Sequence, residues 1–352
     1  MGGLIVDLKA CLEKGAVEAS APCRIDMGGT LDLSTFHLPL RHLGPCTFNA
    51  ALNLRTRVRL SPFSQGKLKI SSRGFESLEV KSSEAPFSHP LGLIMAVAAY
   101  FQADGVHIEI DSASPPRSAL GGSSVAAVAL AWAFAKALTR AGQALPEPCA
   151  VGLLAHAIEQ SVAGVPCGLQ DQLAAVYGGV SGWYWLAEPG GRLFERREVV
   201  PPEGCAEFSK HLLVAYCGVP HVSKDINGTW VREFLSGRHR TEWHHITALS
   251  RQFIEALSGG HYDQAVSLMN RETDLRVAMT PEVLDEVGRL LVTAARDQGC
   301  GARFTGAGGG GCIWALGRPP QLEILRPAWD QILSRRGEAK ILDTAVDPTG
   351  VL

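Results

Sequence analysis

Residues 114–134, SPPRSALGGSSVAAVALAWAF, join a glycine-serine loop directly to an apolar, alanine-rich segment. Glycines let a backbone approach a ligand closely, and the first turn of a helix presents unpaired N–H groups that bind anions. The alternative is that Ser123 or Ser124 only caps the helix, as serines commonly do. The stretch is not a Walker A loop, because no Lys-Ser/Thr pair follows the glycines. It predicts a phosphate-binding or a capping turn.

The whole chain has the size and composition of an ordinary two-domain globular protein. Its 352 residues exceed most single cores, and 46% are hydrophobic and 19% charged. The formal net charge of −2 provides no basic field for a polyanion. We therefore expect neither nucleic acid nor a membrane as a partner.

Cysteine usage and hydropathy point to a cytoplasmic protein. The nine cysteines include no Cys-x-x-Cys pair or other zinc spacing, so we expect reduced thiols. The first 15 residues have too short an apolar run for a signal peptide. No segment approaches about 18 apolar residues without a charge, so we expect no membrane span.

The hydrophobic pattern predicts mixed α and β structure. Residues 53–60 and 105–112 alternate apolar and polar side chains, which is typical of half-buried strands. Residues 125–139 are apolar on nearly all sides, which predicts a buried helix. Two more helices are expected at 150–163 and 170–177, separated by a short break.

The second half of the chain repeats this mixture after a Pro/Gly-rich, charged stretch at 188–205. That stretch is the best candidate for a domain junction. Strands are expected at 180–185, 211–216, 311–316 and 339–346, and helices near 241–257, 262–270 and 281–298.

Two further stretches carry candidate site residues. Residues 302–312, ARFTGAGGGGC, concentrate glycines between a helix and a strand, which suits either close backbone packing against a ligand or a flexible turn. Residues 18–36 place Arg24, Asp26 and Asp32 near two glycines. Those charges could form a surface ion pair or could accept the hydroxyls of a polyol.

A predicted helix–break–helix unit at residues 156–179 supplies two acids, Glu159 and Asp171. One carboxylate could hold Mg²⁺, and the other could orient or deprotonate a hydroxyl. The alternative is two solvated acids on unrelated faces. The apolar surroundings favour a shared pocket, because an unpaired buried charge is costly.

Taken in this order, the motifs resemble those of the GHMP kinases, the superfamily of galactokinase, homoserine kinase and mevalonate kinase. Residues 21–24 (APCR) are similar to its first motif, 116–124 (PRSALGGSS) to its second and 303–311 (RFTGAGGGG) to its third. Residues 159–172 (EQSVAGVPCGLQDQ) resemble the corresponding segment of galactokinases and of heptose and fucose-like sugar kinases.

The resemblance implies a two-domain α+β fold with the active site in the cleft between the domains. The N-terminal domain, residues 1–195, would be a ribosomal-protein-S5-like α/β domain that binds ATP. The C-terminal domain, residues 196–352, would be a ferredoxin-like α+β domain. The implied reaction is ATP- and Mg²⁺-dependent phosphorylation of a small-molecule sugar, at the anomeric hydroxyl, by a monomer or homodimer. The alternatives are a kinase for a non-sugar, mevalonate-like alcohol and a catalytically weak sugar or nucleotide sensor.

The resemblance also implies residue roles. Asp171 would face the sugar hydroxyl beside Arg24, and Ser123 and Glu159 would hold magnesium. The ATP phosphates would lie against Pro116, Leu120, Gly121, Gly122, Ser123 and Ser124. Other sugar contacts would come from Asp32, Cys167 and Gly168, and the closing glycine loop would comprise Thr305, Gly306, Ala307, Gly308 and Gly309.

Departures from the motifs limit the substrate inference. Cys23, Ala119 and Gly122 replace the usual glycine, glycine and serine, and Arg303 replaces a lysine. The segment 28–32, GGTLD, lacks the glutamate and histidine that galactokinases use on the sugar, so galactose itself is not implied. The loop at 221–225 is expected either to reach the sugar or to be an ordinary polar loop.

Overall fold

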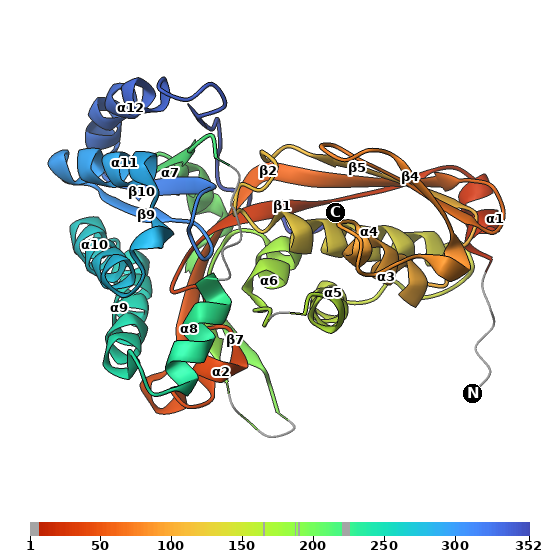
Figure 1. Ribbon diagram of the computed structural model, residues 1–352, viewed down its shortest axis with the longest axis horizontal. Helices are drawn as coiled ribbons and strands as arrows, with labels where there is room; N and C mark the ends of the chain where they lie inside the picture. The colour runs from red at the N-terminus through yellow and green to blue at the C-terminus, as the bar shows by residue number, and fades with distance from the viewer. Residues whose placement is uncertain (1–6, 165, 187, 189–190, 220–225) are drawn as a thin grey trace.

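The computed structural model describes residues 7–352 except 165, 187, 189–190 and 220–225. Two sheets organise the molecule, which is elongated with one lobe around each sheet (Figure 1). This arrangement confirms the predicted two-domain α+β class.

The larger sheet has seven strands in the order β4-β3-β5-β2-β6-β7, with β1 also paired to β2. Every pairing is antiparallel except that of β3 with β5. The strands predicted at 53–60 and 105–112 pair with each other inside β2 and β5. The bounds are β1 (Val17–Met27), β2 (Cys46–Pro62), β3 (Lys67–Ser72), β4 (Leu78–Lys81), β5 (Val106–Ser112), β6 (Val180–Trp185) and β7 (Phe194–Val200).

Helices α3 (Gly92–Tyr100), α4 (Gly122–Thr139), α5 (Pro148–Val162) and α6 (Gln170–Tyr177) lie along one side of this sheet (Figure 1). Helix α4 is long and apolar enough to cross a membrane by length and composition, but 72% of it is buried inside the protein. It is therefore the central core helix that its all-round apolar sequence predicts.

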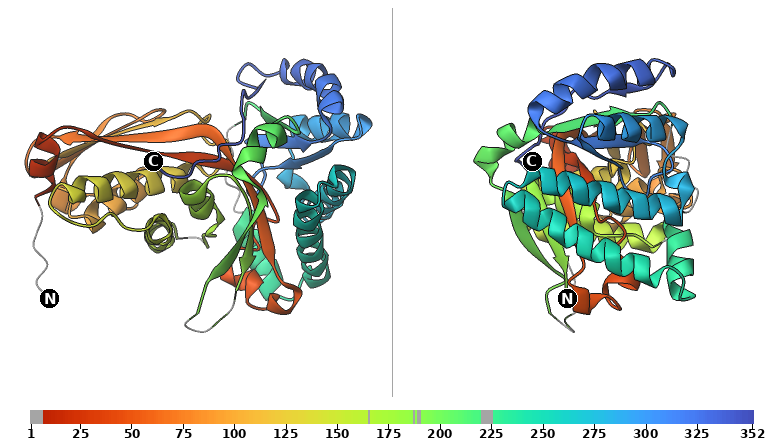
Figure 2. Two further views of the ribbon diagram at one scale, coloured as in Figure 1. Left: turned by 180° about the vertical axis from the view of Figure 1, so that it is seen from behind. Right: turned by 90° about the vertical axis from the view of Figure 1, so that its left-hand side faces the viewer.

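The smaller sheet has four antiparallel strands in the order β11-β8-β10-β9. Helices α11 and α12 cover one face of this sheet, and α9 and α10 cover the other (Figures 1 and 2). Alternate side chains of β10 therefore pack into two different hydrophobic clusters, one on each face. The bounds are β8 (Leu212–Tyr216), β9 (Gly301–Phe304), β10 (Cys312–Leu316), β11 (Lys340–Ile341), α9 (Arg240–Ser258), α10 (Tyr262–Met279), α11 (Glu286–Asp297) and α12 (Pro319–Leu333).

Several short elements complete the chain. They are α1 (Leu8–Glu13), α2 (Ser34–His37), α7 (Cys205–Ser209), α8 (Ile226–Leu235) and the 3₁₀ turns Arg41–Leu43, Ser82–Glu84, Pro202–Gly204 and Pro281–Val283. The helix expected near 281–298 is therefore divided into a 3₁₀ turn and α11, which begins at Glu286, and α10 is longer than its predicted 262–270.

The connection between the two lobes differs from the predicted junction at 188–205. Phe194–Val200 is a regular strand, β7, paired with β6. A boundary at 195/196 therefore falls inside this strand, and the division into 1–195 and 196–352 stays a prediction. The C-terminal segment returns to the larger sheet, where Leu52 bridges to Val346 and Arg55 pairs with Asp347 at 2.6 Å.

Candidate active site

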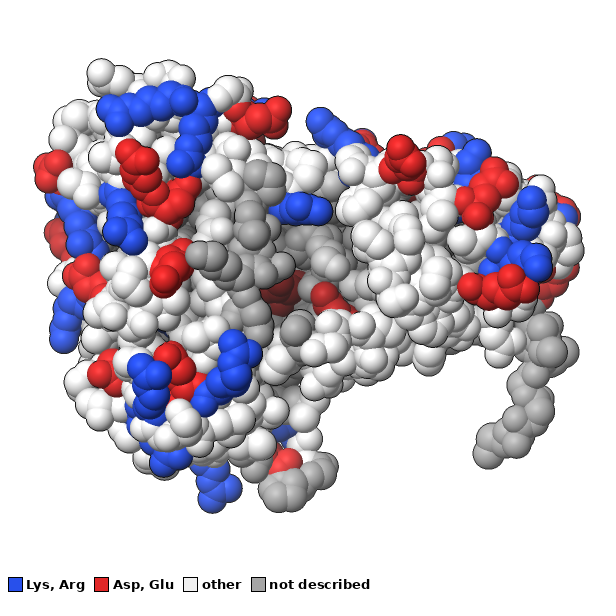
Figure 3. Space-filling model, viewed as in Figure 1, with Lys and Arg blue, Asp and Glu red and all other residues white. Residues whose placement is uncertain are grey.

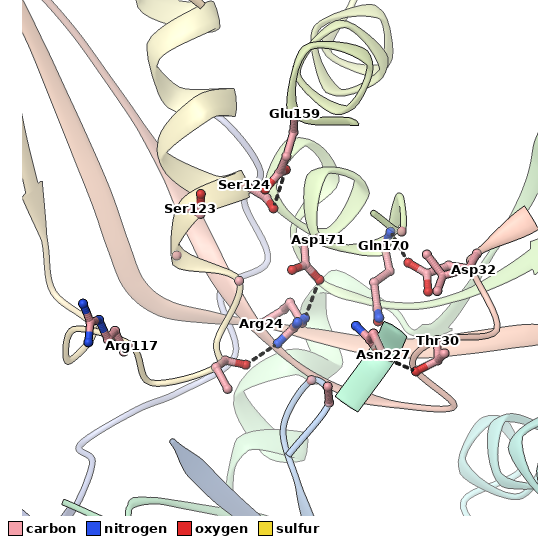
Figure 4. A pocket seen from close by; sticks show the side chains of 17 residues that line it. Arg24, Thr30, Asp32, Arg117, Ser123, Ser124, Glu159, Gln170, Asp171 and Asn227 are labelled. Carbon is pink, nitrogen blue, oxygen red and sulfur yellow. Dashed lines mark hydrogen bonds and ion pairs between the residues drawn. The ribbon is translucent and has the colours of Figure 1, made fainter. Parts of the chain in front are cut away.

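A cavity of about 620 Å³ opens between the two lobes (Figure 3). Its lining comes from the loop before α4, from β1, α5, α6, α8 and the segments around residues 30–33 and 306–307. Most candidate site residues from all four sequence motifs line it, as the close-up shows (Figure 4).

The glycine-serine loop reaches this cavity at the N-terminus of α4. Gly121 precedes the helix in a left-handed conformation, with φ of +80°, and α4 has no side-chain cap. The capping alternative is therefore wrong, and no described side chain accepts a hydrogen bond from the first-turn N–H groups. A four-residue run of the loop and helix lines the cavity: Gly121, Gly122, Ser123 and Ser124.

The residues that precede Gly121 in this loop differ in burial and in whether they line the cavity. Pro116 is exposed and lies outside the cavity lining. Leu120 is buried beneath the loop, and its carbonyl oxygen accepts a hydrogen bond from the backbone N–H of Arg24 at 3.2 Å. Arg117 lines the cavity, although no motif had singled it out.

Glu159 faces the first turn of α4 from α5. Its Oε2 accepts hydrogen bonds from the Ser124 hydroxyl at 2.7 Å and from Gln172 Nε2 at 2.6 Å. Burial raises the pKa of Glu159 to about 7, with the Asp171 charge adding to the rise and the two hydrogen bonds opposing it. The contact with Glu159 belongs to Ser124, whereas Ser123 is exposed at the cavity.

A divalent cation fits this corner of the cavity. The described residues include no cluster of three or more His, Cys, Asp or Glu side chains. A cation here would thus be held by one carboxylate, hydroxyls and ligand oxygens, a set that suits Mg²⁺ because it keeps few protein ligands. Glu159 is a half-buried carboxylate that forms no ion pair with another described residue, and it provides the charge that such an ion needs.

Arg24 and Asp171 form an ion pair at the floor of the cavity (Figure 4). Arg24 Nε donates to Asp171 Oδ1 at 2.8 Å, and Arg24 Nη1 donates to the carbonyl oxygen of Ala119, also at 2.8 Å. Burial opposes the Arg24 charge, but Asp171 and Asp26 outweigh it and raise the pKa of Arg24 above its ordinary value. A Cβ at Gly121 would lie only 3.0 Å from Asp171 Oδ2, so this carboxylate also touches the loop.

Asp32 lies across the cavity from this pair, packed against the turn before α6. Its Oδ2 accepts a hydrogen bond from the backbone N–H of Gln170 at 3.1 Å. A Cβ at Gly168 would lie 1.7 Å from the same oxygen, so only glycine fits there. Burial raises the pKa of Asp32 to about 7, opposed in part by the Gln170 N–H.

Neutral polar groups complete this end of the cavity. Thr30 Oγ1 donates to Asn227 Oδ1 at 3.1 Å, which joins the loop after β1 to α8. Both residues and Gln170 line the cavity, and sequence reasoning had named none of them as a site residue. Asn227 follows the 221–225 loop, which lies outside the described residues.

Cys167 is placed differently from its prediction as a sugar contact. It lines a second cavity of about 440 Å³, together with His37, His156 and Trp185, and is absent from the lining of the main one. Asp32 borders both cavities. Gly168, its neighbour, does line the main cavity as predicted.

The residues of the C-terminal glycine loop also differ in position: some line the main cavity and others do not. Gly306 and Ala307 line the cavity. Thr305 is buried, and its hydroxyl donates to the carbonyl oxygen of Cys312 at 3.2 Å. Gly308 and Gly309 pack against Val283: a Cβ at Gly308 would lie 2.5 Å from the Val283 carbonyl oxygen, which accepts the Gly309 N–H at 2.9 Å.

A family model and a sequence relative both indicate similarity to the GHMP kinases. The model of the GHMP kinases N terminal domain matches residues 90–179. A mevalonate kinase from Pyrococcus horikoshii is 26% identical over 340 residues, covering 88% of this chain and 90% of the relative.

Solved structures share the whole fold at low sequence identity. A galactokinase from Lactococcus lactis in complex with galactose superposes with a TM-score of 0.72 at 17% identity, covering 98% of this chain and 99% of that one. A D-glycero-D-manno-heptose 1-phosphate kinase from Bacteroides thetaiotaomicron has a TM-score of 0.69 at 17% identity, covering 95% and 97%.

Proposed function

We propose that this chain, a member of the GHMP kinase superfamily, is an ATP-dependent kinase that phosphorylates a hydroxyl of a sugar. One observation carries this proposal. The Arg24–Asp171 pair lies in a single cavity with the open N-terminus of α4 on one side and Asp32 on the other. A phosphate donor and a hydroxyl acceptor can therefore meet at Asp171.

The donor end suits the phosphates of ATP. The uncapped first turn of α4 offers N–H groups and the positive end of the helix dipole, and Arg117 adds a cation. Glu159 and the Ser123 hydroxyl would hold Mg²⁺, and the Ser124 hydroxyl orients the Glu159 carboxylate. Bound Mg²⁺ neutralises charge on the phosphates during transfer.

Asp171 is the residue in place to act on the attacking hydroxyl. The hydroxyl oxygen forms a bond to the γ-phosphorus, the bond from that phosphorus to the leaving ADP oxygen breaks, and the proton passes to Asp171. Arg24 fixes the orientation of the Asp171 carboxylate through the 2.8 Å contact between Arg24 Nε and Asp171 Oδ1. An anomeric hydroxyl is more acidic than an ordinary alcohol, so a carboxylate base suffices.

The charges at the acceptor end favour a neutral polyol over an acid. Asp32 and Asp171 accept hydroxyl protons, and Thr30, Gln170 and Asn227 are uncharged. Among the described residues, Arg24 is the cation nearest to them in this lining, and Asp171 and the Ala119 carbonyl already occupy two of its donors. A substrate carboxylate would face two protein carboxylates, which disfavours a mevalonate-like acid.

A kinase for a non-sugar alcohol is the second candidate, because the relatives that align over most of the chain are named mevalonate kinases. ADP release separates the two functions when it is measured with galactose, fucose, a heptose phosphate, glucuronate and mevalonate. We expect turnover with a sugar. Turnover with mevalonate alone would establish the second candidate, and binding of ATP and sugar without ADP release would indicate a sensor.

A further inference from the structure

Six side chains of alternating charge form a continuous chain from the cavity into the core of the C-terminal lobe. Asp171 is 20% exposed, Arg24 is 4% exposed, and the remaining four are fully buried. In order, the members are Asp171, Arg24, Asp26, Arg303, Glu272 and Arg276. Three positive and three negative charges leave the chain neutral.

Asp26 is the branch point of this charge chain. Its Oδ1 lies 3.6 Å from Arg24 Nη1 and accepts the backbone N–H of Gly306 at 2.6 Å. Its Oδ2 accepts from Arg303 Nη1 at 3.2 Å. One carboxylate thereby joins the arginine that holds Asp171 to the cavity-lining turn of the glycine loop, although Asp26 itself does not line the cavity.

The far end of the chain returns to the acceptor side of the cavity. Arg303 Nε donates to Glu272 Oε2 at 2.8 Å, and Arg276 Nε donates to Glu272 Oε1 at 2.9 Å. Arg276 Nη2 then donates to the carbonyl oxygen of Gly29 at 2.7 Å, next to Thr30.

Arg276 is held between two aromatic rings. Its guanidinium carbon lies 4.7 Å from the Trp230 ring centroid and 4.5 Å from that of Trp243. Helix α10 is thus connected by rigid contacts to the loop that carries Thr30 and Asp32.

Burying this chain of charged side chains costs desolvation free energy, and a gain in stability alone does not account for it. Buried ion pairs often contribute little net stability compared with apolar packing, while removing one partner is strongly destabilising. A buried hydrogen-bonded network fixes the groups that it pairs in one arrangement. Of the six side chains, Arg276 alone has a buried nitrogen, Nη1, with no partner among the described residues. Here two of the members so fixed, Arg24 and Asp171, line the cavity where the reacting groups would meet.

We propose, resting on the kinase function above, that Asp26 is a positioning residue: it sets Arg24, and through it Asp171, together with the Gly306 turn, in the geometry that phosphoryl transfer requires. Because Asp26 does not touch the cavity, its loss acts on kcat more than on the KM of either substrate. A misplacement of about 1 Å costs on the order of 100-fold in rate, which is the fall in kcat expected for Asp26→Asn.

Asp26→Asn alone leaves one buried positive charge in excess, between Arg24 and Arg303, and lowers stability. The double variant Asp26→Asn/Arg303→Met restores neutrality, since Arg24 still faces Asp171 and Arg276 still faces Glu272. We expect the Tm of the double variant to lie above that of Asp26→Asn while its kcat stays about 100-fold below wild type. A purely structural role predicts that kcat recovers with Tm, so a double variant within about threefold of wild-type kcat would overturn the proposal.

Asp347→Asn is the matched control, because it breaks a largely buried Arg–Asp pair that does not line the cavity. It should lower Tm and leave kcat unchanged. A crystal structure of the double variant decides the question independently of activity. Displacement of the Arg24 guanidinium and of Gly306 N supports the positioning role, and an unchanged Arg24–Asp171 contact and Gly306 turn refutes it. Absence of wild-type turnover with every sugar would instead count against the sugar kinase function.

Discussion

Gly168→Ala tests how the acceptor end of the cavity is built. The new Cβ would lie 1.7 Å from Asp32 Oδ2, 2.2 Å from its Cγ and 2.6 Å from Oδ1. Protein Cβ atoms essentially never come closer than 3.0 Å to such neighbours, so Asp32 or the turn must move by about 1.3 Å. The φ angle of Gly168 lies outside the left-handed region. The substitution therefore tests the steric clash and not backbone strain.

That displacement breaks the 3.1 Å hydrogen bond from the Gln170 N–H to Asp32. Loss of a buried hydrogen bond costs about 1–3 kcal/mol. If the cost falls on acceptor binding, the KM for the sugar rises about 5- to 150-fold, since about 1.4 kcal/mol is tenfold. The KM for ATP should stay within about twofold, because the donor end is untouched.

Steady-state kinetics with each substrate varied at saturating concentrations of the other measures both constants. Gly337→Ala is the control, because a Cβ there meets no atom within 4 Å and Gly337 also lacks a left-handed φ. An unchanged KM for the sugar in a folded Gly168→Ala protein would refute the role of Asp32 as an acceptor-binding group.

Three further outcomes are expected. Asp171→Asn should abolish ADP release while ATP affinity, measured by calorimetry, stays nearly unchanged; surviving turnover would exclude Asp171 as the base. Glu159→Gln should raise the Mg²⁺ concentration that gives the half-maximal rate more than tenfold. Ser124→Ala should raise it only a few-fold, because Gln172 still holds Glu159. Equal responses of the two variants in a Mg²⁺ titration would contradict this. Burial raises the pKa of Asp32 to about 7, so between about pH 4 and 7 the folded protein binds more protons than the unfolded chain and loses stability as pH rises. Thermal unfolding across this range should show a smaller loss in Asp32→Asn, and an equal loss in both proteins would contradict the burial argument.

Local patterns in the sequence predicted the elements that depend on local chemistry. The helix expected at 170–177 is α6 with those bounds, because a Pro/Gly break precedes it and two glycines follow. The sequence signal of β7 was masked by the charged residues of 188–205, because β7 lies at the edge of the sheet and all but one of its side chains are partly or fully exposed. Edge strands carry a weak apolar signal.

Contacts across the chain could not be predicted in the same way. Helix α4 begins at Gly122, three residues before the expected start, which brings Ser124 into the first turn against Glu159. Asn227 reaches the cavity from α8, a helix with no recognisable motif. Tertiary packing decides which of two adjacent serines meets a carboxylate, and one sequence alone carries no record of it.

The product of the reaction tests the central claim most directly. Purified protein is incubated with ATP, Mg²⁺ and either one sugar of the panel or mevalonate, and the products are examined by ³¹P NMR. We predict a new phosphomonoester signal, coupled to the anomeric proton, that grows in step with ADP. A phosphoester from mevalonate with none from any sugar would contradict the account.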